Sequence, residues 1–293
     1  MKNLRRLVVP PTYISYLVSI REAKKIAMAD RGTTADHKFI LTRVEATITA
    51  RYAELQDAVD SRTLEGLSKS AGMRAIGNSL RSCYDNDTKA IRELKTAIAD
   101  AQDIRVLKYC PLCGTTLVAT HDHHLPASLF PEFAVHPLNL VPCCSTCNST
   151  KGDDWLDEDG KRLYIHAYSD LLPVEVFLQV DLKTSAATTG VGAVFSIARP
   201  HRFSKSAWAV IESHFGRLNL IARYTDLSND EIAEILADCQ IYLRSGGTNV
   251  KRFLKQRAAE RSNIYGSSHW QAVLMNKIAT SARLDSWISR VKN

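Results

Sequence analysis

Apolar residues recur every three or four positions in two long parts of the chain. The first part runs from about residue 21 to 105, and the second from about residue 204 onward. In the first part the pattern is set by Leu41, Val44, Ile48, Tyr52, Leu55 and Val59, and then by Ile91, Leu94 and Ile98. Because this spacing gathers apolar side chains on one helical face, both parts are predicted to be helical.

Capping residues indicate where some of these helices begin and end. Asp87 stands at an N-cap position before the second apolar run, and Ser228 precedes Glu231 at the spacing of a capping box. Gly246 and Gly247 follow that run and predict its end. We therefore expect one helix to begin near Asp87 and another to run from Ser228 to the glycine pair.

The N-terminal twenty residues carry a different pattern. Pro10 and Pro11 interrupt the apolar positions and remove helical hydrogen bonds, which predicts an extended arm over residues 1–20. The same prolines break the only apolar run near the start, so we expect no export signal. No run of about eighteen apolar residues follows, so no membrane span is expected either.

The middle of the chain has short apolar or alternating runs that are typical of strands. The loop TSAATTG over residues 184–190 has the small-residue composition of an exposed connection. Together with the helical parts, these runs predict an α+β protein with mainly helical flanks. The expected strands lie at residues 115–120, 163–168, 174–182 and 191–197.

Charge divides the sequence in the same way as the hydrophobic pattern. The chain has 293 residues and a net charge of +7. Residues 1–109 hold 19 Lys and Arg against 13 Asp and Glu, residues 110–198 hold 4 against 10, and residues 199–293 hold 15 against 8. Basic flanks favour a polyanionic partner, whereas an acidic centre favours a cation. A mildly basic balance is also common in proteins without a nucleic-acid partner.

Two CxxC pairs frame the middle segment. Cys110 with Cys113 and Cys144 with Cys147 are separated by thirty residues, and two such turns supply the four thiolates of a tetrahedral structural zinc site. Cys143 makes the second pair read CCxxC and offers an alternative ligand. The seven cysteines are odd in number, and four of them have metal-ligand spacing, so we expect a reducing, cytoplasmic setting.

The insert between the CxxC pairs contains residues suited to phosphodiester hydrolysis. Asp122-His123-His124-Leu125-Pro126 is followed by Asn139-Leu140, and Asn148 and Lys151 follow the last cysteine. This order, from Cys110 to Trp155, resembles the motif of HNH endonucleases in its zinc-bound form, with Asn as the third motif residue. The resemblance covers about forty-six residues.

The resemblance implies a ββα-metal core with His123 at the end of the first strand. It assigns His123 as general base, and Asp122 and Asn148 as ligands of one Mg²⁺ or Mn²⁺ ion. Asn139 braces the loop and the His123 ring. Lys151 shares a helical face with Asn148, so it either contacts a phosphate or faces solvent. The chemistry also favours these residue types, because hydrolysis needs a base for water and hard ligands for the cation.

Three other histidines and an acidic stretch lie close to the motif in sequence. His121 alternates with His123 and points to the same strand face, which favours a substrate contact. We expect His124 to pack and His166 to be a hydrogen-bonded core histidine. The acidic stretch DDWLDED after the motif is expected to face solvent, because its charge would repel DNA.

A basic run follows the predicted end of the long C-terminal helix. Lys251, Arg252, Lys255, Arg257 and Arg261 alternate with Val250, Phe253 and Leu254. One face of this helix should therefore pack, while the other is strongly positive. We interpret Lys251, Arg252 and Lys255 as DNA-binding residues; the alternative is an ordinary solvated face.

Together these features predict three parts: a helical region with an arm at 1–105, the HNH core with following strands at 106–200, and a basic helical region at 201–293. The expected function is a metal-dependent DNA endonuclease with structural Zn²⁺. Anti-phage defence with a regulatory ATPase partner is one expected context, and restriction or homing is another. The alternative from a different class is an inactive zinc-stabilised module that binds DNA or protein. The oligomeric state and target sequence stay open.

Overall fold

The computed structural model describes residues 2–8, 12–103, 105–184 and 190–290, which form two compact units. The motif unit comprises Asn3–Leu112 and Thr116–Asp170. The C-terminal unit comprises Leu171–Asn293 together with the short segments Met1–Lys2 and Cys113–Thr115. The division into three parts at residues 105 and 200 stays a prediction.

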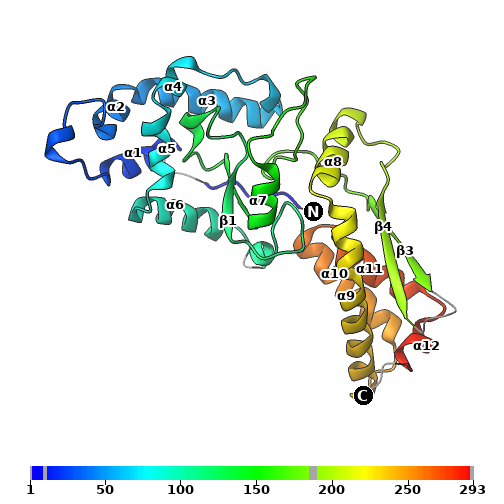
Figure 1. The fold of residues 1–293 in the computed structure, drawn as a ribbon. Coiled ribbons are helices and arrows are strands. Elements are labelled where there is room, and N and C mark those ends of the chain that lie inside the picture. Colours follow the sequence, from blue (N-terminus) through cyan, green and yellow to red (C-terminus); the bar gives the residue numbers. More distant parts are fainter. Residues whose placement is uncertain (1, 9–11, 104, 185–189, 291–293) are drawn as a thin grey trace. The chain divides into compact units, whose positions relative to one another are not determined.

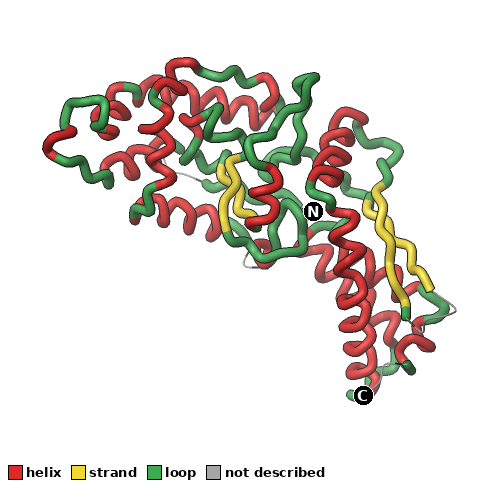
Figure 2. The backbone as a smooth tube through the Cα atoms, in the orientation of Figure 1, coloured by secondary structure: helices red, strands yellow, loops and turns green. Residues whose placement is uncertain are grey.

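Helices make up most of the regular structure, as Figure 2 shows in red. The strands pair into two small antiparallel sheets of two strands each. The expected α+β class with mainly helical flanks is therefore confirmed. Among the described residues, no helix has both the length and the apolar composition needed to cross a membrane.

Six α-helices precede the motif in the motif unit (Figure 1). Their buried apolar residues include all of the predicted pattern except Val44, which lies between α2 and α3 and is only partly buried. The helical prediction for this part of the chain is thus confirmed. The helices are α1 (Ile14–Glu22), α2 (His37–Arg43), α3 (Glu45–Ser61), α4 (Ala71–Ala75), α5 (Gly77–Asp85) and α6 (Lys89–Asp100), with short 3₁₀ turns at Met28–Asp30, Leu64–Gly66 and Val106–Lys108.

Two predictions about this part need correction. The N-cap of α6 is Thr88 rather than Asp87, because the Thr88 hydroxyl accepts a hydrogen bond from the Ile91 N–H at 3.3 Å. Asp87 instead pairs with Arg92 at 2.6 Å. The predicted extended arm over residues 1–20 is too long, since α1 already begins at Ile14. Pro10 and Pro11, on which that prediction depended, lie outside the described residues.

A hairpin followed by a helix occupies the motif segment (Figure 1). Strand β1 (Thr120–His123) pairs antiparallel with β2 (Leu140–Cys143), and α7 (Ser145–Lys151) follows directly. A long loop containing the 3₁₀ turn Pro131–Phe133 connects the strands. The expected strand at 115–120 is wrong except for its last residue. The run 163–168 is buried without forming a strand, because its apolar side chains pack as an irregular segment.

The C-terminal unit places a second hairpin against helices. Strands β3 (Leu178–Thr184) and β4 (Val191–Ile197) pair antiparallel, and their inward residues Val180 and Phe195 are buried. The 184–190 loop prediction falls mainly on residues outside the described part. The helices are α8 (Lys205–Arg217), α9 (Leu220–Arg244), α10 (Val250–Tyr265), α11 (Trp270–Thr280) and α12 (Leu284–Ile288).

The long helix α9 contradicts the predicted start at Ser228. It begins eight residues earlier, and Ser228 is fully buried inside it, where its hydroxyl donates to the Thr225 carbonyl at 2.7 Å. Ser228 and Glu231 therefore resemble a capping box only in sequence. The predicted end is right, since α9 stops at Arg244, two residues before the glycine pair.

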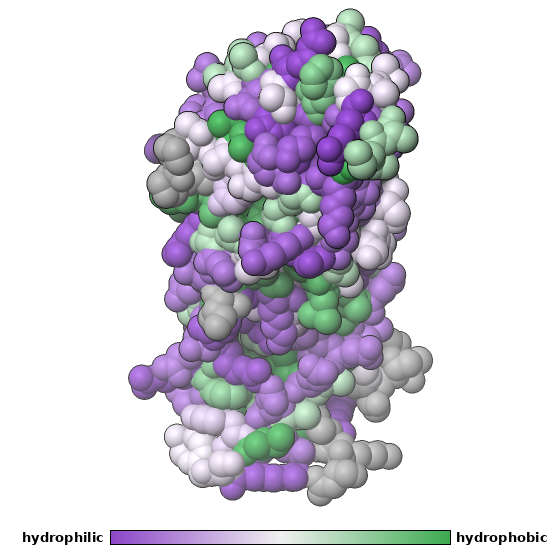
Figure 3. Space-filling view, turned by 90° about the vertical axis from the view of Figure 1, so that its left-hand side faces the viewer, coloured by the Kyte–Doolittle hydropathy of each residue, from purple (hydrophilic) through white to green (hydrophobic). Residues whose placement is uncertain are grey.

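Most residues on the face shown in Figure 3 are hydrophilic, and hydrophobic residues occur there in scattered groups. The acidic stretch after the motif agrees with this pattern, because Asp153, Asp154, Asp157, Glu158 and Asp159 are all exposed. Its expected orientation toward solvent is thus confirmed.

Candidate functional site

Four buried thiols form a candidate zinc centre. The sulfur atoms of Cys110, Cys113, Cys144 and Cys147 all lie within 4.8 Å of one another. Two local turns bring them together: the Cys147 N–H points to the Cys144 sulfur at 3.4 Å, and the Cys110 N–H donates to Thr116 at 2.7 Å. Four thiolates at this spacing fit a tetrahedral zinc ion. The cluster supports the predicted structural ligand set.

Cys143 lies outside this cluster. It is the last residue of β2, pairs with Thr120 across the hairpin and is fully buried. Burial raises the pKa of its thiol to about 12, and the nearby Asp122 carboxylate acts in the same direction. Among the described cysteines, only Cys110, Cys113, Cys144 and Cys147 form a group suited to one ion.

Asp122 and Lys151 form a buried ion pair between β1 and α7. The Lys151 Nζ lies 3.0 Å from Asp122 Oδ1 and donates to the His123 carbonyl at 2.8 Å. The side chains of the pair are only 1% and 4% exposed, so Lys151 does not face solvent. Burial raises the pKa of Asp122, whereas the Lys151 ammonium opposes that shift.

His123 ends β1, and its imidazole is held by the loop between the strands. Its Nε2 lies 2.8 Å from the Ala134 carbonyl oxygen. A carbonyl can only accept a hydrogen bond, so Nε2 carries the proton and Nδ1 keeps its lone pair in the neutral ring. Burial lowers the pKa of His123, which favours that neutral form. This tautomer can accept a proton at Nδ1.

Asn139 braces the chain on both sides of its own loop. Its Oδ1 accepts a hydrogen bond from the Leu125 N–H at 2.7 Å. Its Nδ2 donates to the carbonyls of Leu125 and Phe133, each at 3.1 Å. The first contact fixes the chain just after His123, and the last fixes the residue before Ala134. Asn139 therefore acts on His123 indirectly, through backbone positions.

The loop that carries Ala134 is also tied to the preceding helices. Glu132 is fully buried and accepts from the Arg51 Nε of α3 at 2.9 Å. The Arg51 guanidinium also donates to the Ser68 carbonyl at 2.7 Å. This contact holds the acceptor of the His123 hydrogen bond against the helical layer.

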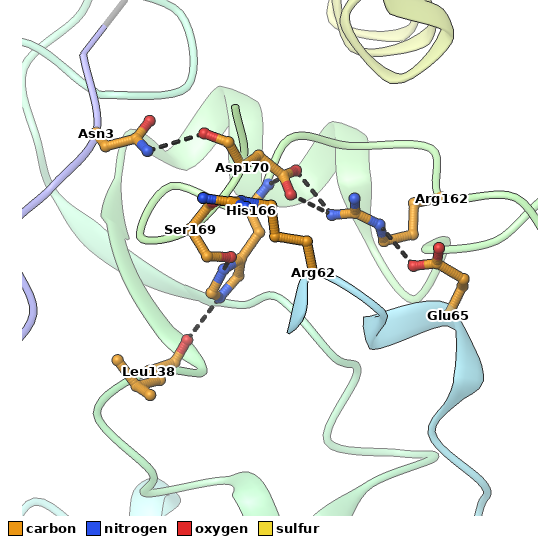
Figure 4. Close-up of polar contacts among 8 residues, drawn as sticks. All are labelled: Asn3, Arg62, Glu65, Leu138, Arg162, His166, Ser169 and Asp170. Atoms are coloured by element: carbon orange, nitrogen blue, oxygen red, sulfur yellow. Dashed lines mark hydrogen bonds and ion pairs between the residues drawn. The ribbon is translucent and has the colours of Figure 1, made fainter. Parts of the chain in front are cut away.

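A second network holds Leu138, the loop residue just before Asn139 (Figure 4). His166 Nε2 donates to the Leu138 carbonyl at 2.9 Å, and its Nδ1 lies 2.7 Å from the Ser169 hydroxyl. The Asp170 carboxylate accepts hydrogen bonds from the Arg162 guanidinium at 2.7 Å and from the His166 backbone N–H at 2.8 Å. Burial lowers the pKa of His166 to about 4. His166 is therefore a neutral, hydrogen-bonded core residue, as predicted.

Two residues outside the motif lie near His123, one against its ring and the other on the far residue of that contact. The Tyr84 ring of α5 packs against the imidazole with centroids 4.4 Å apart, and Lys95 of α6 approaches the same Tyr84 ring at 4.3 Å. Sequence reasoning missed both, because neither residue belongs to a recognisable pattern. Only the fold brings these helices to the end of β1.

The structure thus brings Asp122, His123, Asn139 and Lys151 into one connected region of the motif unit. Asn148 lies on α7, one turn before Lys151, and is partly exposed. Lys251, Arg252 and Lys255 belong to the C-terminal unit, where they are exposed on α10 while Val250 and Leu254 are buried. The packed and charged faces of α10 are therefore as expected.

Comparison with known proteins finds a similarity to Protein ea31 of Escherichia phage lambda. The two sequences are 25% identical over 176 residues, which covers 58% of this chain and 58% of that protein. The chain therefore matches a little over half the length of this relative. No family model and no solved structure matches the chain.

Proposed function

We propose that this protein is a metal-dependent endonuclease of the HNH type that hydrolyses DNA phosphodiester bonds. The observation that carries the proposal is the state of His123. The His123 Nε2–H donates a hydrogen bond to the Ala134 carbonyl, so the Nδ1 lone pair can accept a proton. The neighbouring Asp122 side chain points to α7, where it pairs with Lys151. A neutral, oriented imidazole is what general-base activation of water requires.

The residues around His123 have the other properties that hydrolysis needs. The hairpin and α7 have the strand–strand–helix order that the motif implies, and Asn139 fixes the backbone around the base. In the proposed reaction, His123 Nδ1 takes a proton from the attacking water. The new P–O bond forms as the bond to the 3′ oxygen breaks, and that oxygen takes a proton from solvent water, which leaves a 5′-phosphate and a 3′-hydroxyl.

Asp122 and Asn148 are the residues that would hold the divalent cation. Their carboxylate and amide oxygens are hard ligands, which suit Mg²⁺ or Mn²⁺. The Lys151 ammonium, 3.0 Å from Asp122, indicates that this carboxylate accommodates positive charge beside it. When bound, the ion supplies charge neutralisation at the phosphate and the leaving oxygen.

The four-cysteine cluster supports a structural role for Zn²⁺ in the same core. Cys144 directly precedes α7 and Cys147 lies within it, so a zinc ion there would fix the start of the helix that carries Asn148 and Lys151. Under this proposal the two metals have different tasks. Zinc holds the fold, and the hard cation takes part in cleavage.

DNA is the proposed substrate because basic residues are concentrated in the flanks. The exposed Lys251, Arg252 and Lys255 of α10 would neutralise phosphates outside the cleavage site. The similarity to a phage protein accords with a place in conflicts between phage and host. Control by an ATPase partner, cytoplasmic location, and a restriction or homing role remain secondary parts of the proposal.

The direct test is cleavage of an end-labelled DNA duplex in Mg²⁺ or Mn²⁺, with analysis of the product ends. We expect strand breaks that carry 5′-phosphate and 3′-hydroxyl groups and that disappear in EDTA. The alternative is an inactive zinc-stabilised module, which would bind DNA or protein and leave the duplex intact under every metal condition. An intact duplex would therefore favour that alternative.

A further inference from the structure

The His123 ring packs against a residue from the N-terminal helices. The Tyr84 ring of α5 meets the imidazole edge to face, at a centroid distance of 4.4 Å and an angle of 70°. The Tyr84 hydroxyl also approaches the His121 carbonyl at 3.4 Å. One aromatic side chain therefore contacts both alternate residues of β1 that point to the same strand face.

A lysine from α6 lies on the same aromatic ring. The Lys95 Nζ of α6 is 4.3 Å from the Tyr84 centroid, and within the described part of the chain it makes no ion pair. Lys95 is partly exposed. Lys151 differs in both respects, because it is buried and already bound to Asp122 and to the His123 carbonyl.

These contacts decide which cation near His123 is available to DNA. Lys151 is only 1% exposed, and its ammonium already donates to the His123 carbonyl and pairs with Asp122, so it cannot reach a phosphate without shifting α7 from β1. A cation–π contact at a partly exposed site is weak, so Lys95 can exchange it for a phosphate at little cost. The predicted phosphate contact of Lys151 is therefore better assigned to Lys95.

We infer that Tyr84 and Lys95 complete the candidate catalytic site from outside the motif, with Lys95 binding a phosphate of the DNA strand and Tyr84 positioning the His123 ring. This inference rests on the proposed nuclease function. It gives α5 and α6 a task beyond packing, because they supply one wall of the site. Lys95 acts on the substrate, whereas Tyr84 acts only through His123.

The role of Lys95 can be measured without cleavage, by DNA binding in a His123→Ala background. Lys95→Met should weaken binding to a short duplex and lower the slope of log K against log salt by about 1. Lys89→Met is the matched control, because Lys89 lies on the same helix with an 84% exposed side chain. It should leave both quantities unchanged. Equal effects of the two substitutions would overturn the assignment of Lys95.

The role of Tyr84 is tested by steady-state cleavage with otherwise natural protein. Tyr84→Phe keeps the ring and should retain the wild-type rate. Tyr84→Leu fills most of the space without an aromatic edge, so we expect kcat to fall about tenfold while KM stays within about twofold. Parallel loss in Phe and Leu variants, or no loss in either, would overturn the positioning role.

The measurements of DNA binding and DNA cleavage distinguish failure of this inference from failure of the proposed nuclease function. If wild-type protein cuts DNA and both Lys95→Met and Tyr84→Leu behave as wild type, only the inference is wrong. If wild-type protein cuts no DNA and Lys95→Met still lowers the salt slope, the nuclease proposal fails and the assignment of Lys95 as a phosphate-binding residue stands. If Lys95→Met changes neither cleavage nor DNA binding, Lys95 does not contact DNA.

Discussion

In the buried Asp122–Lys151 pair, each charge is compensated by its partner. Both side chains are nearly inaccessible, so neither charge can be hydrated if its partner is removed. The ammonium also holds the His123 carbonyl, which couples the pair to the end of β1. Stability of the hairpin and orientation of the candidate base are therefore expected to change together.

Replacement of Lys151 by Met should destabilise the protein by about 3–5 kcal/mol, because Asp122 remains buried without a partner. Adding Asp122→Asn should recover part of that loss, since the uncompensated charge is then gone. Denaturant unfolding of both variants measures the effect. Lys161→Met is the control, because its pair with Asp159 is exposed and should contribute little. Similar losses for Lys151→Met and Lys161→Met would contradict this account.

His166 gives a second prediction for single residues, in the pH dependence of stability. Its folded pKa is lowered to about 4 by burial, whereas an unfolded histidine titrates near 6.5. Between these values the unfolded chain binds the extra proton, so stability falls as pH drops from about 6.5 to about 4. The contribution of this group is about 3 kcal/mol.

The His166→Asn variant isolates that contribution in unfolding measured across this pH range. The variant should be less stable at neutral pH, and its stability should decline less steeply in acid than that of the natural protein. Identical slopes for the two proteins would show that His166 does not remain neutral in the folded state. The network in Figure 4 would then need a different protonation assignment.

At the scale of elements, we predict that a zinc ion on the four-cysteine cluster is needed for the hairpin and α7 to form. Cys110→Ser should remove bound zinc and unfold the motif unit, because a structural zinc contributes directly to folding. Cys143→Ala is the matched control, since Cys143 is equally buried but lies outside the thiol cluster. Metal analysis and circular dichroism should show one zinc ion per chain in Cys143→Ala and none in Cys110→Ser. Zinc loss in both would contradict the ligand set.

Sequence predictions were accurate where the signal depends on a few neighbouring residues, and they failed where the outcome depends on packing. The end of α9 at the glycine pair and strand β4 were predicted well, because turn residues and alternation act within a few positions. Ser228 was misread, since a buried serine can bond to its own helix and the capping spacing then means nothing. The run 163–168 was misread because burial alone does not distinguish a strand from packed irregular chain.

The candidate site shows the same limit. His123, Asn139 and the four clustered cysteines could be found from spacing, because their chemistry repeats a motif. Tyr84 and Lys95 could not, since they approach His123 only after α5 and α6 have packed. The partner of Lys151 was also beyond the sequence, because it depends on how α7 lies against β1.

At the scale of the whole molecule, the basic flanks are expected to bind DNA phosphates, whereas the acidic centre is expected to bind the cation. The three exposed bases of α10, Lys251, Arg252 and Lys255, should each neutralise about one phosphate. Replacing all three with Ala should lower the salt slope of DNA binding by about 3 and leave thermal stability nearly unchanged. Filter binding at several salt concentrations measures this. An unchanged slope would identify α10 as an ordinary solvated face.

The central claim is that His123 activates water for DNA cleavage, and plasmid cleavage by His123→Ala tests it most directly. The natural protein, His123→Ala and His201→Ala are compared in Mg²⁺; His201 is exposed and lies outside the motif. We predict that His123→Ala loses about a hundredfold to ten-thousandfold in rate while binding zinc and folding normally, and that His201→Ala is unaffected. Cleavage by His123→Ala at the natural rate would contradict the account.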